Sequence, residues 1–255
     1  MTKLASGALT LWAWARYAMR VKICAFGMPT LNVGKHNLKD PRLEIVDDLV
    51  EAEKKTYAQV EVVGEEQTLQ ADAIVVGRDR FPDLILHDLE FVEKRLERDP
   101  QQNERELLLR IRRELEEERT LYQTGLSAEE LQVIASHGFK THKPAVVAGA
   151  SDLDNPGELL LKAFREAGYI CFLTVGGKEN RAWPIRSGTT AWDAAGAIHS
   201  DIQKGFIRAE VISYNDLVDA GGETEAKRAG KLRLEHKSYV VQDYDIVSFR
   251  FNKPK

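Results

Sequence analysis

The sequence predicts an α/β protein in two parts: a small parallel sheet with an inserted helical hairpin, then a C-terminal mixed sheet of β-grasp type. Short apolar runs alternate with helical patterns as far as residue 157, which is the order expected for a parallel sheet. The stretch 82–122 carries apolar residues at helical spacing and one polar interruption, as a helical hairpin does. After residue 168 the order becomes strand, strand, helix, strand and late strands, which is a β-grasp plan.

The composition is that of an ordinary globular protein without a strong charge bias. Hydrophobic residues make up 43% and charged residues 30% of the 255 residues, and the formal net charge is −4. This small charge gives no whole-chain argument for nucleic-acid binding, so such binding must rest on local patches. Cys24 and Cys171 lie far apart and have no metal-ligand spacing, and the histidines form none either. We therefore expect no metal site, and reduced thiols predict a cytoplasmic protein.

Residues 1–20 do not continue into the pattern that follows. The run 8–15 is apolar but too short to cross a bilayer, and Arg16 and Arg20 follow it closely. Lys3 in front of the run and the small residues at its end are also features of a signal peptide. We interpret residues 1–20 as an extraneous N-terminal extension, with a targeting segment as the alternative, and we expect no membrane partner.

A glycine-containing stretch after the first predicted strand, 21–26, approaches the pattern of a phosphate-binding loop. Such a loop needs G-x-x-x-x-G-K-[ST], so that its amides surround the phosphates and its hydroxyl binds magnesium. Here six residues separate the glycines, and His36, a poor ligand for magnesium, stands in place of the hydroxyl. The stretch is either a degenerate phosphate loop or an ordinary turn. Its candidate nucleotide-binding residues are Gly27, Asn32, Val33, Gly34 and Lys35.

The next elements complete the predicted parallel sheet. Asp40 and Pro41 suit the cap and first turn of a helix that we expect to run to about Lys55. The strands expected after it are 57–63, 71–76 and 145–148.

The helical hairpin is predicted over 82–122. Apolar residues repeat at 4-3-4 spacing from Ile85 to Leu96, and the second helix is expected to end near Tyr122. The charges of 110–119 are mixed in sign, which is typical of a solvated helix face. The hairpin is a candidate surface for a protein partner.

Capping residues mark two later helices. Ser127 and Glu130 have the spacing of a capping box, and Thr189 or Thr190 precedes an expected helix over 191–199.

The C-terminal strands are separated from the first sheet by a polar loop at 151–157. This loop divides the chain into the extension 1–20, a first domain 21–157 and a second domain 158–255. Pro184 cannot donate to a ladder, so its strand should have an open edge there. The strands expected in this domain are 169–175, 182–185, 206–212, 239–241 and 246–251.

The stretch 168–252 closely resembles the C-terminal TGS domain of the YchF-type Obg-like ATPases. The matching segments are KENRAW at 178–183, IHSD at 198–201, KGFIRAEV at 204–211, GKLRL at 230–234 and KSYVVQD at 237–243. Weaker matches extend the likeness back to Val21. The resemblance implies a shortened member of the family: a reduced P-loop-type parallel sheet with a helical hairpin insertion, followed by a C-terminal β-grasp (TGS) domain.

The departures from the family lie in the parts that hydrolysis needs. The family loop reads G-x-P-N-V-G-K-S, whereas this chain inserts Thr30 and Leu31 and has His36 for the serine. The switch regions are nearly absent, and Ala150 and Leu153 stand where the family recognises the base. Phosphoryl transfer depends on positioning by these parts, so we expect no catalytic residue and no hydrolysis. The alternatives are a protein that still binds ATP or GTP and hydrolyses it slowly, and a remnant without function.

A further departure lies in the turn 243–245. Tyr244 stands where the family usually has glycine, so strain is expected if this position needs a positive φ.

The resemblance also implies a partner, because TGS domains resemble small modules that dock RNA, ribosomes or regulators. Basic side chains would contact phosphates, and aromatic rings would stack on bases. His199 is equally explained as a helix-end histidine bonded to a neighbouring carbonyl. The candidate contact residues are Trp183, His199, Lys204, Phe206, Arg208, Lys231, Arg233 and Lys237.

Overall fold

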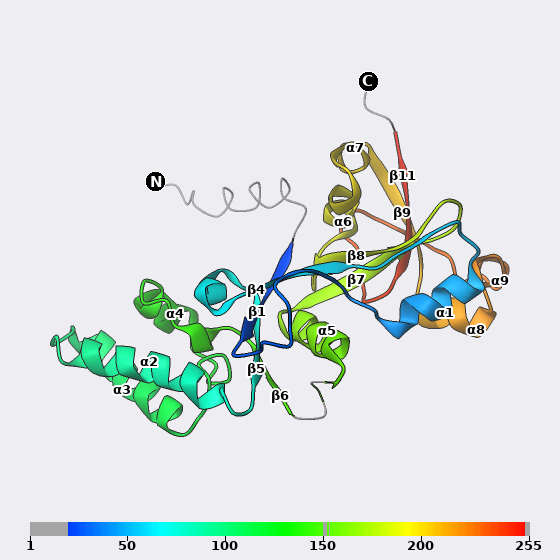
Figure 1. Ribbon diagram of the computed structural model, residues 1–255. Helices are drawn as coiled ribbons and strands as arrows, with labels where there is room; N and C mark the ends of the chain where they lie inside the picture. Colours follow the sequence, from blue (N-terminus) through cyan, green and yellow to red (C-terminus); the bar gives the residue numbers. More distant parts are fainter. Residues whose placement is uncertain (1–19, 150–151, 153, 253–255) are drawn as a thin grey trace, which may run out of the picture. The chain divides into compact units, whose positions relative to one another are not determined.

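The computed structural model describes residues 20–149, 152 and 154–252, and they form two compact units. We call residues 21–36 and 60–167 the parallel-sheet unit, and residues 37–59 with 168–252 the C-terminal unit. The predicted mixed α/β class with a parallel sheet is confirmed (Figure 1). The two units divide the chain differently from the expected domains 21–157 and 158–255. The domain boundary at residue 157 stays a prediction. The expected extension (apart from Arg20), Ala150 and Leu153 lie outside the described residues.

The parallel-sheet unit is built on a five-stranded sheet of order β2-β4-β1-β5-β6. Strand β1 pairs in parallel with β4 and β5, and β5 pairs in parallel with β6. Most side chains of β1 are buried, as expected of a central parallel strand covered on both faces. The strands are β1 (Val21–Phe26), β2 (Gly34–Asn37), β4 (Gln59–Val63), β5 (Ala73–Gly77) and β6 (Ala145–Ala148).

A helical arm extends the parallel-sheet unit, and it confirms the predicted hairpin. Its helices α2 (Phe81–Leu96) and α3 (Gln102–Glu116) pack against each other, and Val92, Leu108 and Ile111 are fully buried between them and their neighbours. Helix α3 ends before the expected Tyr122, because the backbone turns at Glu118 with a φ of 54°.

Shorter helices complete this unit. The predicted capping box of Ser127 and Glu130 opens α4 (Ala128–Ile134). Helix α5 (Pro156–Glu166) packs on β1, β5 and β6. The short 3-10 turns are η2 (Glu65–Gln70) and η3 (Lys140–His142).

The C-terminal unit is built on a six-stranded mixed sheet of order β10-β9-β11-β7-β8-β3. Strand β3 pairs with β8 only at residues 180 and 181, so β8 has an open edge at Pro184, as expected. The prediction of a strand at 239–241 is wrong, because only an isolated bridge between Thr190 and Val240 forms there. The strands are β3 (Lys55–Thr56), β7 (Tyr169–Thr174), β8 (Asn180–Arg186), β9 (Phe206–Ile212), β10 (Arg233–Glu235) and β11 (Ile246–Phe251).

Helices lie on both faces of this sheet (Figure 1). Helix α6 (Ala191–Ile198), capped by Thr190, packs on Phe172 and Val211, and we call their side of the sheet the α6 face. The other side, which Asn180 shares with α1 (Pro41–Leu49), is the α1 face. The remaining helices are α7 (Ser200–Lys204), α8 (Tyr214–Ala220) and α9 (Glu223–Arg228).

Helix α1 confirms the expected start and corrects the expected end. Asp40 caps it by accepting from the backbone N–H of Arg42, and Pro41 occupies its first turn. The helix stops at Leu49 instead of Lys55, because Val50 is extended and the chain goes on to form β3.

Candidate functional site

The candidate phosphate loop forms a turn, and two of its apolar side chains are buried. Gly27 has a φ of 61°, and the N–H of Leu31 donates to the carbonyl of Met28 at 3.1 Å, which closes the turn. The side chains of Met28 and Leu31 are both buried. The two inserted residues, Thr30 and Leu31, therefore fold the loop back on itself.

The residues after this turn form an edge strand, where a phosphate loop would continue into a helix. Gly34 and Lys35 begin β2, and the side chain of Lys35 is exposed. Nε2 of His36 lies 2.6 Å from the carbonyl oxygen of Asn32, so the imidazole bonds within the turn. Helix N-termini bind phosphate because their free N–H groups and dipole point at it, and β2 offers neither.

A carboxylate already occupies the first amide of the turn. The N–H of Gly27 donates to Oε1 of Glu65 at 2.8 Å. A phosphate at this amide would have to displace Glu65 and would lie close to its negative charge. Nucleotide binding by Gly27, Asn32, Val33, Gly34 and Lys35 stays a prediction.

The candidate contact residues of the C-terminal unit are spread over both faces of its sheet. Trp183 and Phe206 pack on the core beneath α6, and therefore lie on the α6 face. Arg208 follows Phe206 by two residues, but a register shift next to Arg250 places it on the α1 face, beside Glu210. The aromatic rings and this arginine therefore do not form one site.

Trp183 is already part of a stack. The guanidinium carbon of Arg181 lies 3.9 Å from the centroid of the indole, and the Phe172 ring stacks at 6.4 Å with an interplanar angle of 14°. The indole Nε1 donates to Oγ1 of Thr174 at 2.9 Å. A base stacking directly on Trp183 would have to displace Arg181.

His199 acts as a helix cap. Its Nδ1 accepts from the backbone N–H of Asp201 at 3.1 Å, at the start of α7. The expected hydrogen bond joined the ring to a carbonyl, whereas in the structure Nδ1 accepts from a backbone amide. Lys204, at the other end of α7, and Lys237 are exposed, and neither has a carboxylate within ion-pair distance in the described part of the chain.

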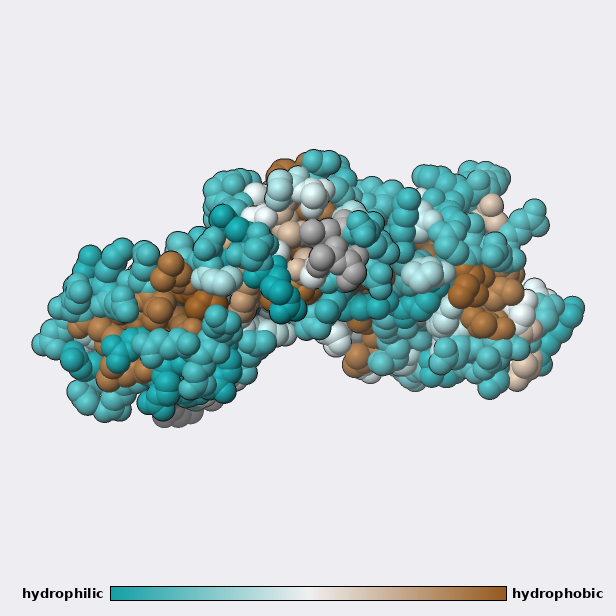
Figure 2. All heavy atoms as spheres, turned by 60° about the horizontal axis from the view of Figure 1, so that its bottom comes forward, coloured by the Kyte–Doolittle hydropathy of each residue, from teal (hydrophilic) through white to brown (hydrophobic). Residues whose placement is uncertain are grey.

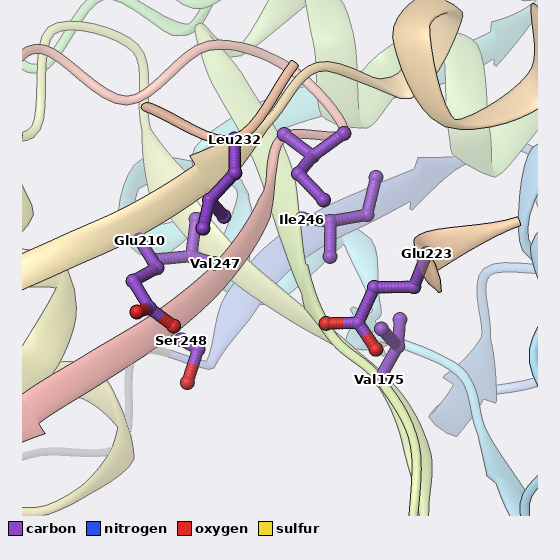
Figure 3. Close-up of a pocket in the computed structure, with 8 residues that line it drawn as sticks. Val175, Glu210, Glu223, Leu232, Ile246, Val247 and Ser248 are labelled. Atoms are coloured by element: carbon purple, nitrogen blue, oxygen red, sulfur yellow. The ribbon is translucent and has the colours of Figure 1, made fainter. Parts of the chain in front are cut away.

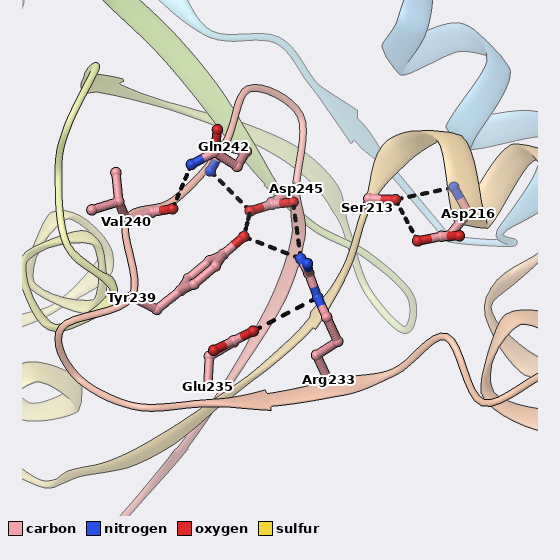
Figure 4. Close-up of polar contacts among 8 residues, drawn as sticks. All are labelled: Ser213, Asp216, Arg233, Glu235, Tyr239, Val240, Gln242 and Asp245. Atoms are coloured by element: carbon pink, nitrogen blue, oxygen red, sulfur yellow. Dashed lines mark hydrogen bonds and ion pairs between the residues drawn. The ribbon is translucent and has the colours of Figure 1, made fainter.

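Two of the candidate cations are already paired within the unit. Nζ of Lys231 lies 2.9 Å from Asp216. Arg233 donates to the hydroxyl of Tyr239 at 3.1 Å and lies 3.7 Å from Glu235 (Figure 4). Lys231 and Arg233 therefore already have polar or charged partners within the C-terminal unit.

Asp245 lies at the centre of the Figure 4 network and was not predicted from the sequence. Its Oδ2 accepts from the hydroxyl of Tyr239 at 2.6 Å and from the N–H of Gln242 at 2.9 Å, and the residue is 1% exposed. Burial raises the pKa of Asp245, and burial together with the hydrogen bond to this carboxylate raises the pKa of Tyr239. The network fixes the loop that leads into β11.

A shallow pocket opens on the α1 face beside β9 and β11 (Figure 3). Glu210, Glu223 and Ser248 supply its polar lining, and Leu232 and Ile246 are among its apolar residues.

The described residues contain neither a metal-binding cluster nor a membrane-spanning helix. No group of three or more His, Cys, Asp or Glu residues among them could hold a metal ion. None of their helices is both long and apolar enough to cross a bilayer.

Comparison with known proteins places the C-terminal part of the chain. Residues 169–252 match the family model YchF-GTPase_C, described as a protein of unknown function (DUF933). "Ribosome-binding ATPase YchF" of Bacillus subtilis (strain 168) is 48% identical over 95 residues, covering 37% of this chain and 26% of that protein. The same-named protein of Pasteurella multocida (strain Pm70) is 57% identical over 102 residues, covering 39% and 28%. "Obg-like ATPase 1" of Rattus norvegicus is 52% identical over 84 residues, covering 33% and 21%.

The match therefore spans about a quarter of the length of these relatives. A solved structure, "Structure of the Schizosaccharomyces pombe YchF GTPase", resembles the fold over more of the chain, with a TM-score of 0.68 and 17% identity. That likeness covers 91% of this chain and 97% of that chain. Residues 169–252 are therefore similar to the YchF family, and the chain resembles the fold of a solved YchF GTPase.

Proposed function

We propose that this protein is a cytoplasmic ribosome- or RNA-binding module of the YchF family that does not hydrolyse nucleotides. The C-terminal unit, which we interpret as a TGS domain of β-grasp type, would carry the contact. The observation that supports this most directly is the contrast between the two units. The C-terminal residues match proteins named ribosome-binding ATPase at 48–57% identity, whereas the segment with Gly34 and Lys35 is an edge strand.

The proposed absence of hydrolysis is supported by what phosphoryl transfer needs. The phosphates must be held by converging amides and a lysine, and a metal must be held by a hydroxyl. The amide of Gly27 bonds to Glu65, and His36 occupies the hydroxyl position and bonds to Asn32. Nothing in this arrangement orders a nucleotide for in-line attack.

Co-sedimentation with ribosomes tests the binding proposal. The full chain should sediment with ribosomes at about 50 mM salt and progressively less as salt rises, because phosphate contacts release counterions. A chain that stays in the supernatant at low salt would show that the proposed partner is wrong.

One observation favours the alternative, a chain that still binds ATP or GTP. The amide of Gly27 already donates to an anionic oxygen, that of Glu65, so its direction suits a phosphate. Isothermal titration with ATP and GTP, with and without magnesium, should detect no micromolar binding. Glu65→Gln, which weakens the internal competitor, is the sharper probe: binding that appears in this variant would favour the alternative.

We further propose the helical arm as a surface for a protein partner. Figure 2 shows apolar side chains on the arm, and Leu86 and Leu109 are 50% and 37% exposed. A contiguous apolar patch on a protein surface is typical of a contact surface. If the arm binds a protein, Leu86→Glu should remove that partner from an affinity purification of the full chain. Glu90→Lys, a charge change on the same helix, serves as the control.

A further inference from the structure

Two arginines lie directly opposite each other on the α1 face of the C-terminal sheet. Arg208 of β9 pairs in register with Arg250 of β11. Directly paired residues project from the same face, with about 5 Å between their Cβ atoms. Like charges in this position repel and destabilise a sheet unless an opposite charge lies between them.

The two arginine charges are balanced unequally. Arg250 donates to Oε1 of Glu210 from Nε, at 2.7 Å, and also from Nη2. Arg208 donates from Nη1 to the carbonyl of Ile207 at 3.1 Å, and no carboxylate of the described residues lies within ion-pair distance of it. One positive charge on this face is therefore uncompensated.

The surface around the arginine pair is open. Leu234 of β10 lies opposite Glu210 in register and is 56% exposed. Ser248, two residues before Arg250 and on the same face, is exposed and borders the pocket of Figure 3. The helices on the α1 face therefore leave this end of the sheet uncovered.

We propose that Arg208 and Arg250 together bind a phosphodiester group of single-stranded RNA on this open face. This inference rests on the proposed function and names the surface that performs it. The two arginines and Glu210 carry a net charge of +1, which matches the single charge of one phosphodiester. A guanidinium presents donors in a planar fork that suits phosphate oxygens, and the hydroxyl of Ser248 adds a donor beside it. Leu234 offers apolar contact to a sugar or base.

Two of the other candidate cations of the unit are less suited to this role. Lys231 is bonded to Asp216, and Arg233 belongs to the network with Tyr239. An anion at either would have to compete with an existing partner, as it also would at Arg250 alone. Arg208, in contrast, has no carboxylate partner among the described residues.

Fluorescence anisotropy of the full chain with a fluorescein-labelled ten-nucleotide uridine RNA tests the proposal. Arg208→Gln should weaken binding about tenfold at the lowest salt. It should also reduce the slope of log affinity against log salt by about 0.7, the value for one phosphate contact on a single strand. Arg250→Gln should weaken binding further, because it leaves the charge of Glu210 facing the phosphate.

Arg228→Gln is the matched control. Arg228 is an exposed arginine of α9 whose carboxylate partner, Glu225, is 3.8 Å away, so its loss changes the net charge equally. Binding of this variant should stay within about twofold of the parent chain. Arg208→Lys keeps the charge and loses the fork, so it should lie between the parent and Arg208→Gln and guard against a folding defect.

Several outcomes would overturn the inference. These are no binding of the RNA by the parent chain, equal losses in Arg208→Gln and Arg228→Gln, or displacement of the RNA by an equal concentration of a ten-residue glutamate peptide. Ribosome sedimentation separates this inference from the proposed function. If Arg208→Gln sediments with ribosomes as well as the parent, the function stands and the Arg208 site is wrong. If RNA binding depends on Arg208 but the parent does not sediment, the site stands and the ribosome is not its partner.

Discussion

The guanidinium carbon of Arg42 lies 3.7 Å from the centroid of the Tyr244 ring and joins α1 to the turn before β11. The same guanidinium lies 2.8 Å from Asp40 Oδ2 and 2.8 Å from Asp243 Oδ2. Burial works against the charge of Arg42, but the hydrogen bond to Asp40 and the charge of Asp243 outweigh it and raise the arginine's pKa. This cation therefore cross-links two segments that are far apart in the sequence.

Arg42→Ala should lower the free energy of unfolding by about 2–3 kcal/mol, because it leaves the buried carboxylate of Asp40 without its guanidinium. Urea denaturation followed by circular dichroism measures the change. Arg42→Lys keeps the charge but loses the fork and the stack, so its loss should be smaller. A change below about 0.5 kcal/mol in the alanine variant would show that the cross-link is not needed.

Tyr244→Gly separates backbone strain from packing. Tyr244 has a φ of 64°, so the condition under which strain was expected is met, and the residue is 2% exposed. Glycine would relieve about 1–2 kcal/mol of strain. It would lose about 2–3 kcal/mol of burial and about 1–2 kcal/mol of the contact with Arg42. The variant should therefore be less stable by about 1–4 kcal/mol in urea denaturation, from the balance of these terms.

Tyr244→Phe is the control for this substitution. It keeps the ring over Arg42, so its stability should stay within about 1 kcal/mol of the parent. A glycine variant more stable than the parent would mean that strain outweighs packing.

The pH dependence of stability should carry a component from Asp245. Burial raises the pKa of this carboxyl above 3.8, the value for an unperturbed aspartate, so the folded state binds the proton more tightly than the unfolded state. The free energy of unfolding should therefore fall as pH rises from about 3.8 through the raised pKa. The asparagine of Asp245→Asn does not titrate. The free energy of unfolding of the parent minus that of the variant, measured by denaturant titration at several pH values, therefore isolates this component.

Tyr239→Phe sharpens the pH experiment. The hydrogen bond from the Tyr239 hydroxyl lowers the pKa of Asp245 and so limits the rise caused by burial. In Tyr239→Phe this hydrogen bond is absent, so the pKa of Asp245 should be higher. The fall in the free energy of unfolding should then extend to higher pH. A parent-minus-variant difference that is flat or rises with pH would contradict the assignment to Asp245.

Asn180→Ala should loosen the segment 37–59 from the C-terminal sheet. The amide of Asn180 donates to Asp47 at 2.8 Å and to the carbonyl of Val50 at 2.7 Å, and its oxygen accepts from the N–H of Gly176 at 2.9 Å. The variant would lose all three hydrogen bonds, of which the one to Val50 is buried, at a cost of about 2–3 kcal/mol.

Hydrogen exchange of the amides in α1 and β3 measures this loosening, because protection should fall there first. Asn155→Ala removes an exposed cap of α5 and serves as the control. Its free energy of unfolding should fall by about 1 kcal/mol, and the protection of the α1 amides should not change. Equal protection of α1 in both variants would show that Asn180 does not hold the segment.

Elements with local signals were predictable from the sequence. Asp40 with Pro41, Ser127 with Glu130, and Thr190 all cap helices as expected, because a cap depends on a few neighbouring residues. The same kind of signal at Ser213, and at Gly221 with its φ of 81°, marks α8, which was not among the expected helices.

Elements created by distant partners were not predictable. Strand β2 reads Gly-Lys-His-Asn and has no apolar alternation, and β3 has two residues and pairs with β8, more than a hundred positions away. Candidate cations were found by residue type, but their pairing was not. Lys231 and Asp216 come from different elements, and the opposition of Arg208 and Arg250 depends on the register of two strands.

The position of segment 37–59 in the C-terminal unit also sets an order for synthesis. Its partners begin at residue 168, so the segment leaves the ribosome about a hundred residues before the sheet that receives it. At about 5–20 residues per second this is a delay of roughly 5–20 seconds. During this delay the apolar side chains of Leu43 and Val46, buried in the finished protein, have no sheet to pack on. The C-terminal unit can therefore close only after the chain is almost complete.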